Sequence, residues 1–145
     1  MKQNDSLMKM LIRTVGLYFN FMRYRIKYHK QICFRGFSVL LAMRDSEILF
    51  NIMGGDKARV FSHPFSNLFG LSQRCIIVAK NGGRIVINDG VCMSGCTIYS
   101  MESITIGRNT DIGSGCKIID NDFHPLSYSE RHPIERLDLL KNVLS

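Results

Sequence analysis

Tryptophan is absent from this chain of 145 residues, and neither a long apolar run nor a low-complexity tract occurs in it. No apolar stretch is long enough for a membrane-spanning helix, and no small-residue cleavage site follows the N-terminal segment, which argues against a secretory signal. The five cysteines form no Cys-x-x-Cys pair and no zinc-like spacing. We therefore expect a single domain with free thiols in a reducing, cytoplasmic compartment.

Acidic residues are nearly missing from the first 30 positions, which hold seven Lys or Arg and one acid, Asp5. The net charge of +7 is therefore mainly a property of this segment. Apolar residues recur in it at helical spacings of three and four, namely Leu7, Leu11, Val15, Tyr18, Met22 and Ile26. We expect an amphipathic helix over residues 1–31. It either packs on the first coil or on a neighbouring subunit, or rests with residues 7–30 on an anionic membrane surface. No nucleic-acid recognition motif follows it.

From Gly83 onward, pairs of small or aliphatic residues two positions apart recur with a period of six. The pairs are Ile85 and Ile87, Val91 and Met93, Ile98 and Ser100, Ile104 and Ile106, Thr110 and Ile112, Cys116 and Ile118. A spacing of two places both side chains on one face of a short strand, and the residues between pairs form turns. The longer interval from Met93 to Ile98 indicates a bulged turn. This period predicts an all-β, parallel β-helix, in which each coil buries its inward residues by stacking on the next. A β-sandwich is the alternative.

The segments on either side complete the predicted organisation. A β-rich composition from residue 32 predicts irregular first coils over 32–82, followed by regular coils over 83–126. Beyond the repeat, Ile134, Leu137, Leu140 and Leu144 recur at about helical spacing. We therefore expect a loop and a short helix over 127–145. This segment either caps the β-helix or is the remnant of a truncation, and we favour truncation.

One motif ends the repeat: Asp120-Asn121-Asp122-Phe123-His124-Pro125. Imidazole titrates near neutral pH and is suited to removing a hydroxyl proton, which makes His124 a candidate general base. Asp120, Asn121 and Asp122 either bind sugar hydroxyls or only form a turn. A zinc-dependent hydratase on a β-helix is a further alternative, but its metal site needs three converging histidines, and the repeat contains no pair of them. We expect no metal.

The segments 106–110, 112–116 and 118–126, with 66–70 and 93–98, resemble the hexapeptide-repeat acyltransferases. More narrowly, they resemble the galactoside and maltose O-acetyltransferases and the relatives that acetylate bacterial surface polysaccharides. The resemblance implies a left-handed β-helix, usually a homotrimer, that transfers an acetyl group from acetyl-CoA to a carbohydrate hydroxyl. It places the catalytic histidine on His124, and Ser94 near an acceptor-binding position.

Those relatives continue past the histidine loop with further coils that form much of the acetyl-CoA groove. This chain has no further hexad after that loop, so two interpretations of it remain. The first is an O-acetyltransferase with His124 as general base. The second is a truncated, catalytically silent repeat protein with only structural or oligomerising capacity.

Overall fold

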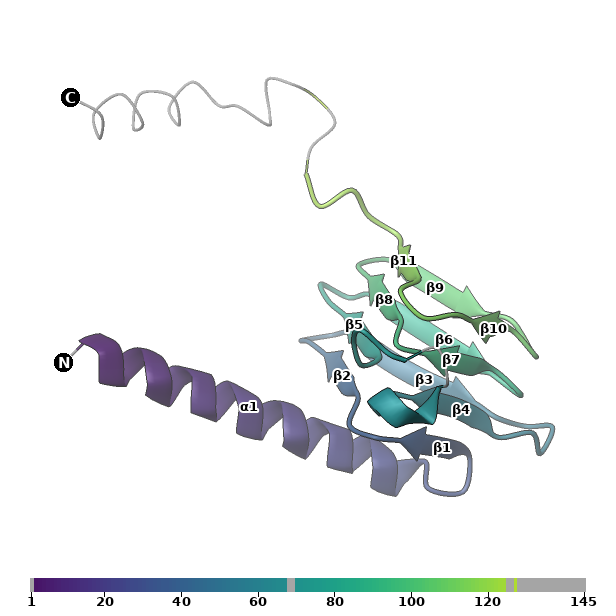
Figure 1. Cartoon of the computed structure of the whole chain (residues 1–145). Helices are drawn as coiled ribbons and strands as arrows, with labels where there is room; N and C mark the ends of the chain where they lie inside the picture. Colours follow the sequence, from purple (N-terminus) through teal and green to yellow (C-terminus); the bar gives the residue numbers. More distant parts are fainter. Residues whose placement is uncertain (1, 68–69, 125–126, 128–145) are drawn as a thin grey trace.

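The computed structural model describes residues 2–67, 70–124 and 127. Within them, helix α1 (Lys2–Lys27) precedes a stack of short strands (Figure 1). The strands are β1 (Ile32–Arg35), β2 (Val39–Ala42), β3 (Glu47–Asn51), β4 (Ala58–Phe61), β5 (Ile76–Ala79), β6 (Arg84–Asn88), β7 (Cys92–Ser94), β8 (Thr97–Ser100), β9 (Ser103–Ile106), β10 (Asp111–Ile112) and β11 (Lys117–Ile119). A 3-10 turn, η1 (Pro64–Ser66), lies between β4 and β5.

The strands form three parallel sheets, each built from every third strand. Their orders are β1-β4-β7-β10, β2-β5-β8-β11 and β3-β6-β9. The chain therefore passes through each sheet once per coil. In the third sheet, Ile85 of β6 lies in register between Ile48 of β3 and Ile104 of β9. The structure thus confirms an all-β fold of the parallel β-helix type with one N-terminal helix.

The predicted inward positions fill the core from β6 to β10. The buried ones are Ile85, Ile87, Val91, Met93, Ile98, Ser100, Ile104, Ile106 and Ile112. The prediction was wrong for Cys116, which is exposed, while Thr110 and Ile118 are only half-buried. These three residues belong to the last coil, and no strand in the part of the chain that the structure describes stacks on β10 or β11. Their inward side is therefore not covered by a further described coil.

The first coil is more regular than predicted, because β1, β2 and β3 each pair in parallel with the corresponding strand of the second coil. The irregularity instead lies in the longer connection from β4 to β5. Ser62, buried at its start, accepts a hydrogen bond from the backbone N–H of Cys75 at 2.9 Å and shares one of 2.8 Å with the Ser38 hydroxyl. These contacts fix both ends of the connection to the core.

The longer interval between Met93 and Ile98 is a turn centred on Gly95, as predicted. Gly95 has a φ of +48°, a conformation that favours glycine. A Cβ there would lie 2.7 Å from the carbonyl oxygen of Gln73. The Gly95 N–H donates to Phe61 O at the end of β4 at 3.0 Å, and the Gly95 carbonyl accepts a bond of 3.1 Å from the Gln73 side chain in the β4–β5 connection.

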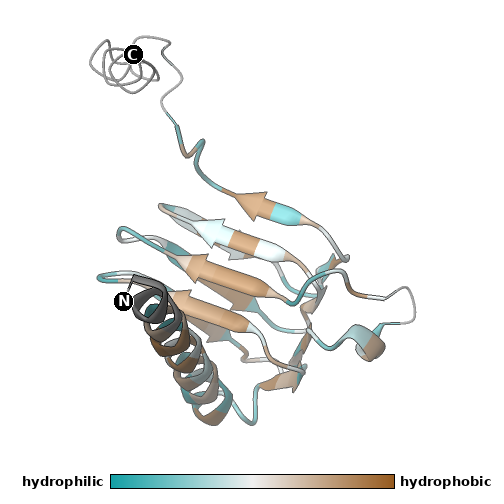
Figure 2. Ribbon diagram, turned by 60° about the vertical axis from the view of Figure 1, so that its left-hand side comes forward, coloured by the Kyte–Doolittle hydropathy of each residue, from teal (hydrophilic) through white to brown (hydrophobic). Residues whose placement is uncertain are grey.

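Helix α1 lies against the end of the stack formed by the first coil (Figure 2), and its N-terminal half runs past the sheets (Figure 1). It packs through Phe21 and Tyr28, which are buried. The Phe21 ring lies edge-on to Phe34 and Phe37, with centroids 5.4 and 5.1 Å away, and the Tyr28 ring lies 5.2 Å from Phe50. Aromatic burial thus closes the first coil.

The helix differs from the prediction in two respects. It ends at Lys27 instead of residue 31, because the N–H groups of Gln31 and Ile32 both donate to the Tyr28 carbonyl and turn the chain into β1. The predicted apolar stripe also packs only in part. Met22 contacts the core and Tyr18 stacks on Phe37, whereas Leu11, Val15 and Ile26 are exposed. No helix among the described residues is long and apolar enough to cross a membrane. The predicted C-terminal helix lies outside the described residues.

Candidate functional site

Asp120, which directly follows β11, closes a corner of the preceding coil. Its Oδ2 accepts hydrogen bonds from the Ser100 hydroxyl at 2.6 Å and the Glu102 N–H at 3.0 Å, and its Oδ1 accepts one from the Met101 N–H at 2.8 Å. The Asn121 side-chain amide adds a longer bond of 3.3 Å. The carboxylate is thus bonded to the turn between β8 and β9. This geometry favours the turn-forming role for Asp120 over direct sugar binding.

These bonds also set the ionisation of Asp120. Partial burial raises the pKa of its carboxyl, but the hydrogen bonds from Ser100, Met101, Glu102 and Asn121 outweigh burial and lower it from 3.8 to about 2. The ionised form therefore stabilises the folded chain above pH 4, and this contribution is lost as the pH falls from about 4 toward 2.

We expect Asp120→Asn to lower the free energy of unfolding by about 1 kcal/mol at pH 6, which is less than the full pKa shift implies because the carboxylate is partly exposed. The difference between the variant and the parent chain should shrink at pH 3. Urea unfolding of both proteins at the two pH values measures it. A difference in unfolding free energy that does not change with pH would contradict a stabilising role for the ionised Asp120 carboxylate.

Beyond Asp120 the chain makes a tight turn that presents the histidine. The Asn121 side-chain oxygen accepts a hydrogen bond from the Phe123 N–H at 3.1 Å, and Phe123 has a φ of +59°. The Phe123 ring packs on Tyr99 of β8, with centroids 4.9 Å apart. A left-handed backbone is unfavourable for a bulky residue, so the Asn121 bond and the ring contact together hold this turn.

The side chains of Asp122 and His124 are exposed, and neither has a hydrogen-bond or ion-pair partner among the residues that the structure describes. Nothing in the described part of this chain therefore fixes the tautomer of the His124 ring. Pro125 lies outside the described residues. The base of the loop is held in place, while the His124 side chain faces solvent.

Ser94 does not join this group. It ends β7, before the turn that leads into β8, whereas Ser100 at the far end of β8 contacts Asp120. The four residues of β8 span roughly 13 Å at about 3.3 Å per residue. The structure therefore brings Asp120, Asn121, Asp122 and His124 together and leaves Ser94 at another corner of the prism.

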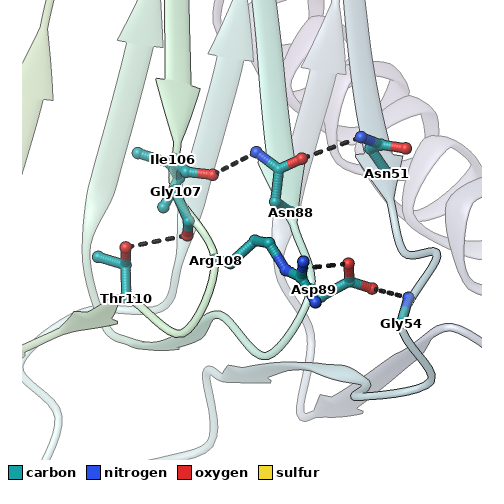
Figure 3. Close-up of polar contacts among 8 residues, drawn as sticks. All are labelled: Asn51, Gly54, Asn88, Asp89, Ile106, Gly107, Arg108 and Thr110. Atoms are coloured by element: carbon teal, nitrogen blue, oxygen red, sulfur yellow. Dashed lines mark hydrogen bonds and ion pairs between the residues drawn. The ribbon is translucent and has the colours of Figure 1, made fainter.

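A second polar region lies at the corner between the β3-β6-β9 and β1-β4-β7-β10 sheets (Figure 3). Asp89, only 6% exposed, accepts a hydrogen bond from the Gly54 N–H at 2.8 Å, and its other oxygen lies 3.6 Å from Arg108 Nε. Asn88 is bonded on both sides, to Asn51 at 3.0 Å and to Ile106 O at 2.8 Å. This network joins three successive coils.

We expect Asp89→Ala to destabilise the fold by about 1.5 kcal/mol, because it leaves the Gly54 N–H without its bonded partner. Arg108→Ala is the matched control. Its side chain is 69% exposed, so we expect a change of at most about 0.5 kcal/mol. Chemical denaturation of both variants measures the contrast. Equal losses would show that the surface ion pair, and not the Gly54 bond, supports the corner.

Beside this network is a hollow of about 390 Å³, lined by Asp56, Lys57, Arg59, Gly90 and Asn109. Two cations against one carboxylate make it suitable for an anionic group. It lies at a different corner of the coil from Asp120 and His124, so a single chain does not combine the two regions. Sequence reasoning missed Lys57 and Arg59, because they stand outside the regular repeat.

Sequence reasoning also placed Ser100 only as an inward residue. The sequence feature that could have indicated its bonding role is a hydroxyl at a position where aliphatic residues otherwise stand. A buried hydroxyl requires a hydrogen-bond partner.

Among the described residues, no group of three His, Cys, Asp or Glu side chains is placed to hold a metal ion.

Compared with protein-family models, curated proteins and solved structures, the chain matches none of them. The functional assignment therefore depends on the motif around His124 and on its geometry.

Proposed function

We propose that this chain is an O-acetyltransferase built on a left-handed parallel β-helix, with acetyl-CoA as donor and a carbohydrate hydroxyl as acceptor. The coil length supports the hexapeptide type of helix. Arg84 pairs with Ser103 and Cys92 pairs with Asp111, one coil later in each case, and both intervals are one residue longer than three hexads. Left-handed winding is what the resemblance to the hexapeptide-repeat acyltransferases implies for such coils.

The observation that carries the proposal is an exposed His124 on a loop whose base is locked to the coil by Asp120. A general base must reach the substrate proton, so its side chain has to be accessible while its backbone is held in place. Asp120 acts here as a positioning residue. Asp122, exposed beside His124, is the remaining candidate in the motif for contact with the acceptor sugar.

In the proposed reaction, the His124 imidazole takes the proton of the sugar hydroxyl as its oxygen attacks the thioester carbonyl carbon. The carbon–sulfur bond then breaks, and CoA leaves as a thiolate that takes the proton back from the imidazolium. The products are the acetylated sugar and CoA, and the imidazole is regenerated. This chemistry needs one base and no metal ion.

The proposal includes a homotrimer. In one protomer His124 faces solvent, and the cationic hollow lies at another corner, so a neighbouring copy has to supply the wall opposite the imidazole. A donor bound between copies is also what the resemblance implies. A cytoplasmic location follows from the free thiols and the donor, and it belongs to the same proposal.

Calorimetric titration with acetyl-CoA tests the proposal, with sedimentation velocity on the same sample. We expect saturable binding in a trimeric species, and weaker binding by a Lys57→Gln/Arg59→Gln variant if the hollow receives the CoA phosphates. If the chain gives no heat of binding at millimolar acetyl-CoA, the enzyme proposal fails, and the silent structural repeat remains.

A further inference from the structure

Helix α1 has two apolar faces, and the first coil covers only one of them. Phe21 and Tyr28, the residue that directly follows the helix, point toward the coil and are buried. Ile12, Phe19 and Ile26 are seven residues apart, and they are 64%, 70% and 67% exposed. At about 100° per residue, this second line of side chains lies roughly 160° around the helix from Phe21. It therefore points away from the β-helix.

The exposed line is part of a longer apolar face. Met8, Leu11 and Val15, all more than half exposed, lie within one turn of it. From Met8 to Ile26 the face runs for about 27 Å at about 1.5 Å per residue. Soluble folds rarely leave a continuous apolar stripe of this size uncovered, and such stripes mark binding surfaces.

The charge along the helix distinguishes two candidate partners for this face, a second copy of α1 and an anionic lipid surface. Residues 8–30 contain six Lys or Arg and no Asp or Glu. Arg13, Arg23 and Arg25 are exposed, and none forms an ion pair with another described residue. A second copy of α1 packed on this face would bring like charges together in a partly desolvated contact. An anionic lipid surface instead offers phosphates to the cations and acyl chains to the apolar face.

We propose that α1 docks in the plane of an anionic membrane surface, with Ile12, Phe19 and Ile26 at the acyl boundary and the Lys and Arg side chains among the headgroups. The opposite face of α1 carries the first coil, and the other coils stack on that coil (Figure 1). The fourth coil therefore lies about 14 Å beyond the first, at about 4.8 Å per coil. The loop of His124 is held at the membrane-distal end.

The test is co-sedimentation of the full chain with vesicles that mix phosphatidylserine and phosphatidylcholine in a ratio of about one to two, beside vesicles of phosphatidylcholine alone. We expect binding to the anionic vesicles that weakens at high ionic strength, and at least tenfold weaker binding to the neutral ones. An Ile12→Ser/Phe19→Ser/Ile26→Ser variant should lose at least tenfold in partition coefficient. Arg13→Gln/Arg23→Gln should lose roughly 30-fold, at about 1 kcal/mol per charge.

Phe65→Ser is the matched control, because Phe65 is an exposed aromatic residue, 92% accessible, on η1 and not on the helix. It should bind vesicles as the parent chain does, and circular dichroism should show all variants folded. Equal binding to neutral and anionic vesicles, or no loss in the serine variant, overturns the proposal. A self-associated species that the serine variant abolishes, without vesicle binding by the parent chain, would assign the face to a second copy. None of these outcomes depends on acetyl transfer.

Discussion

A His124→Ala variant is expected to lose acetyl transfer to a carbohydrate by about 10²- to 10⁴-fold, the usual contribution of a positioned general base. Its free energy of unfolding should change by no more than about 0.5 kcal/mol, because the side chain is exposed and bonded to no other described residue. Steady-state rates and chemical denaturation of the same preparation separate these two effects. The binding of acetyl-CoA should remain.

Asp122→Ala is the control for this substitution, since Asp122 is exposed two positions away in the same loop. If Asp122 only contacts the acceptor, its loss should raise the KM for the sugar while kcat stays within a few-fold of the parent value. A His124→Ala chain that transfers acetyl at the parental rate would remove His124 from the chemistry. A comparable loss of stability in both variants would instead indicate a structural role for the loop.

Gly83→Ala is expected to cause the largest loss of stability, about 3 kcal/mol. A Cβ at this position would overlap the carbonyl oxygen of Ser100 in the next coil and lie 2.9 Å from Lys80 O. Both are backbone atoms, so no side-chain rotation relieves the contact. The Gly83 carbonyl also accepts a hydrogen bond from the Glu47 N–H, so the strain extends over three coils.

Gly107→Ala is the matched control for Gly83, because its nearest contact would be Thr110 Oγ1 at an ordinary 3.6 Å. We expect it to be neutral or to stabilise the fold by up to about 0.5 kcal/mol, through a less flexible unfolded chain. Urea unfolding of both variants measures the contrast. If Gly83→Ala also unfolds like the parent chain, the stacking of the second coil on the third is not as the structure places it.

The six-residue period predicted the interior of the coils well, because an inward side chain in a β-helix is specified by local spacing alone. It failed at Cys116, since burial there needs a further coil on the far side. For helix α1, prediction from the sequence is limited in a different way. A periodic pattern identifies an apolar stripe, but α1 carries two, and only the aromatic packing of Phe21 and Tyr28 on Phe34 and Phe50 selects the inner one.

For the candidate site, the motif drew attention to His124, and its chemistry remains a prediction. The sequence left the role of Asp120 open between sugar binding and turn formation, because its partners Ser100, Met101 and Glu102 lie almost a full coil earlier in the chain. For Ser94, the sequence suggested a place near the site that the structure does not give it. Similarity to a family position does not place a residue near the histidine when β8 lies between them.

The most direct test of the central claim is to incubate the chain with acetyl-CoA and a simple galactoside, and to quantify free CoA and acetylated sugar by chromatography. Chromatography is preferable to a thiol reagent, because Cys116 is exposed and would react. We predict equal amounts of CoA and acetyl ester, both dependent on the sugar and both lost in His124→Ala. A chain that binds acetyl-CoA and forms neither product with any carbohydrate acceptor would contradict the proposed acetyl transfer.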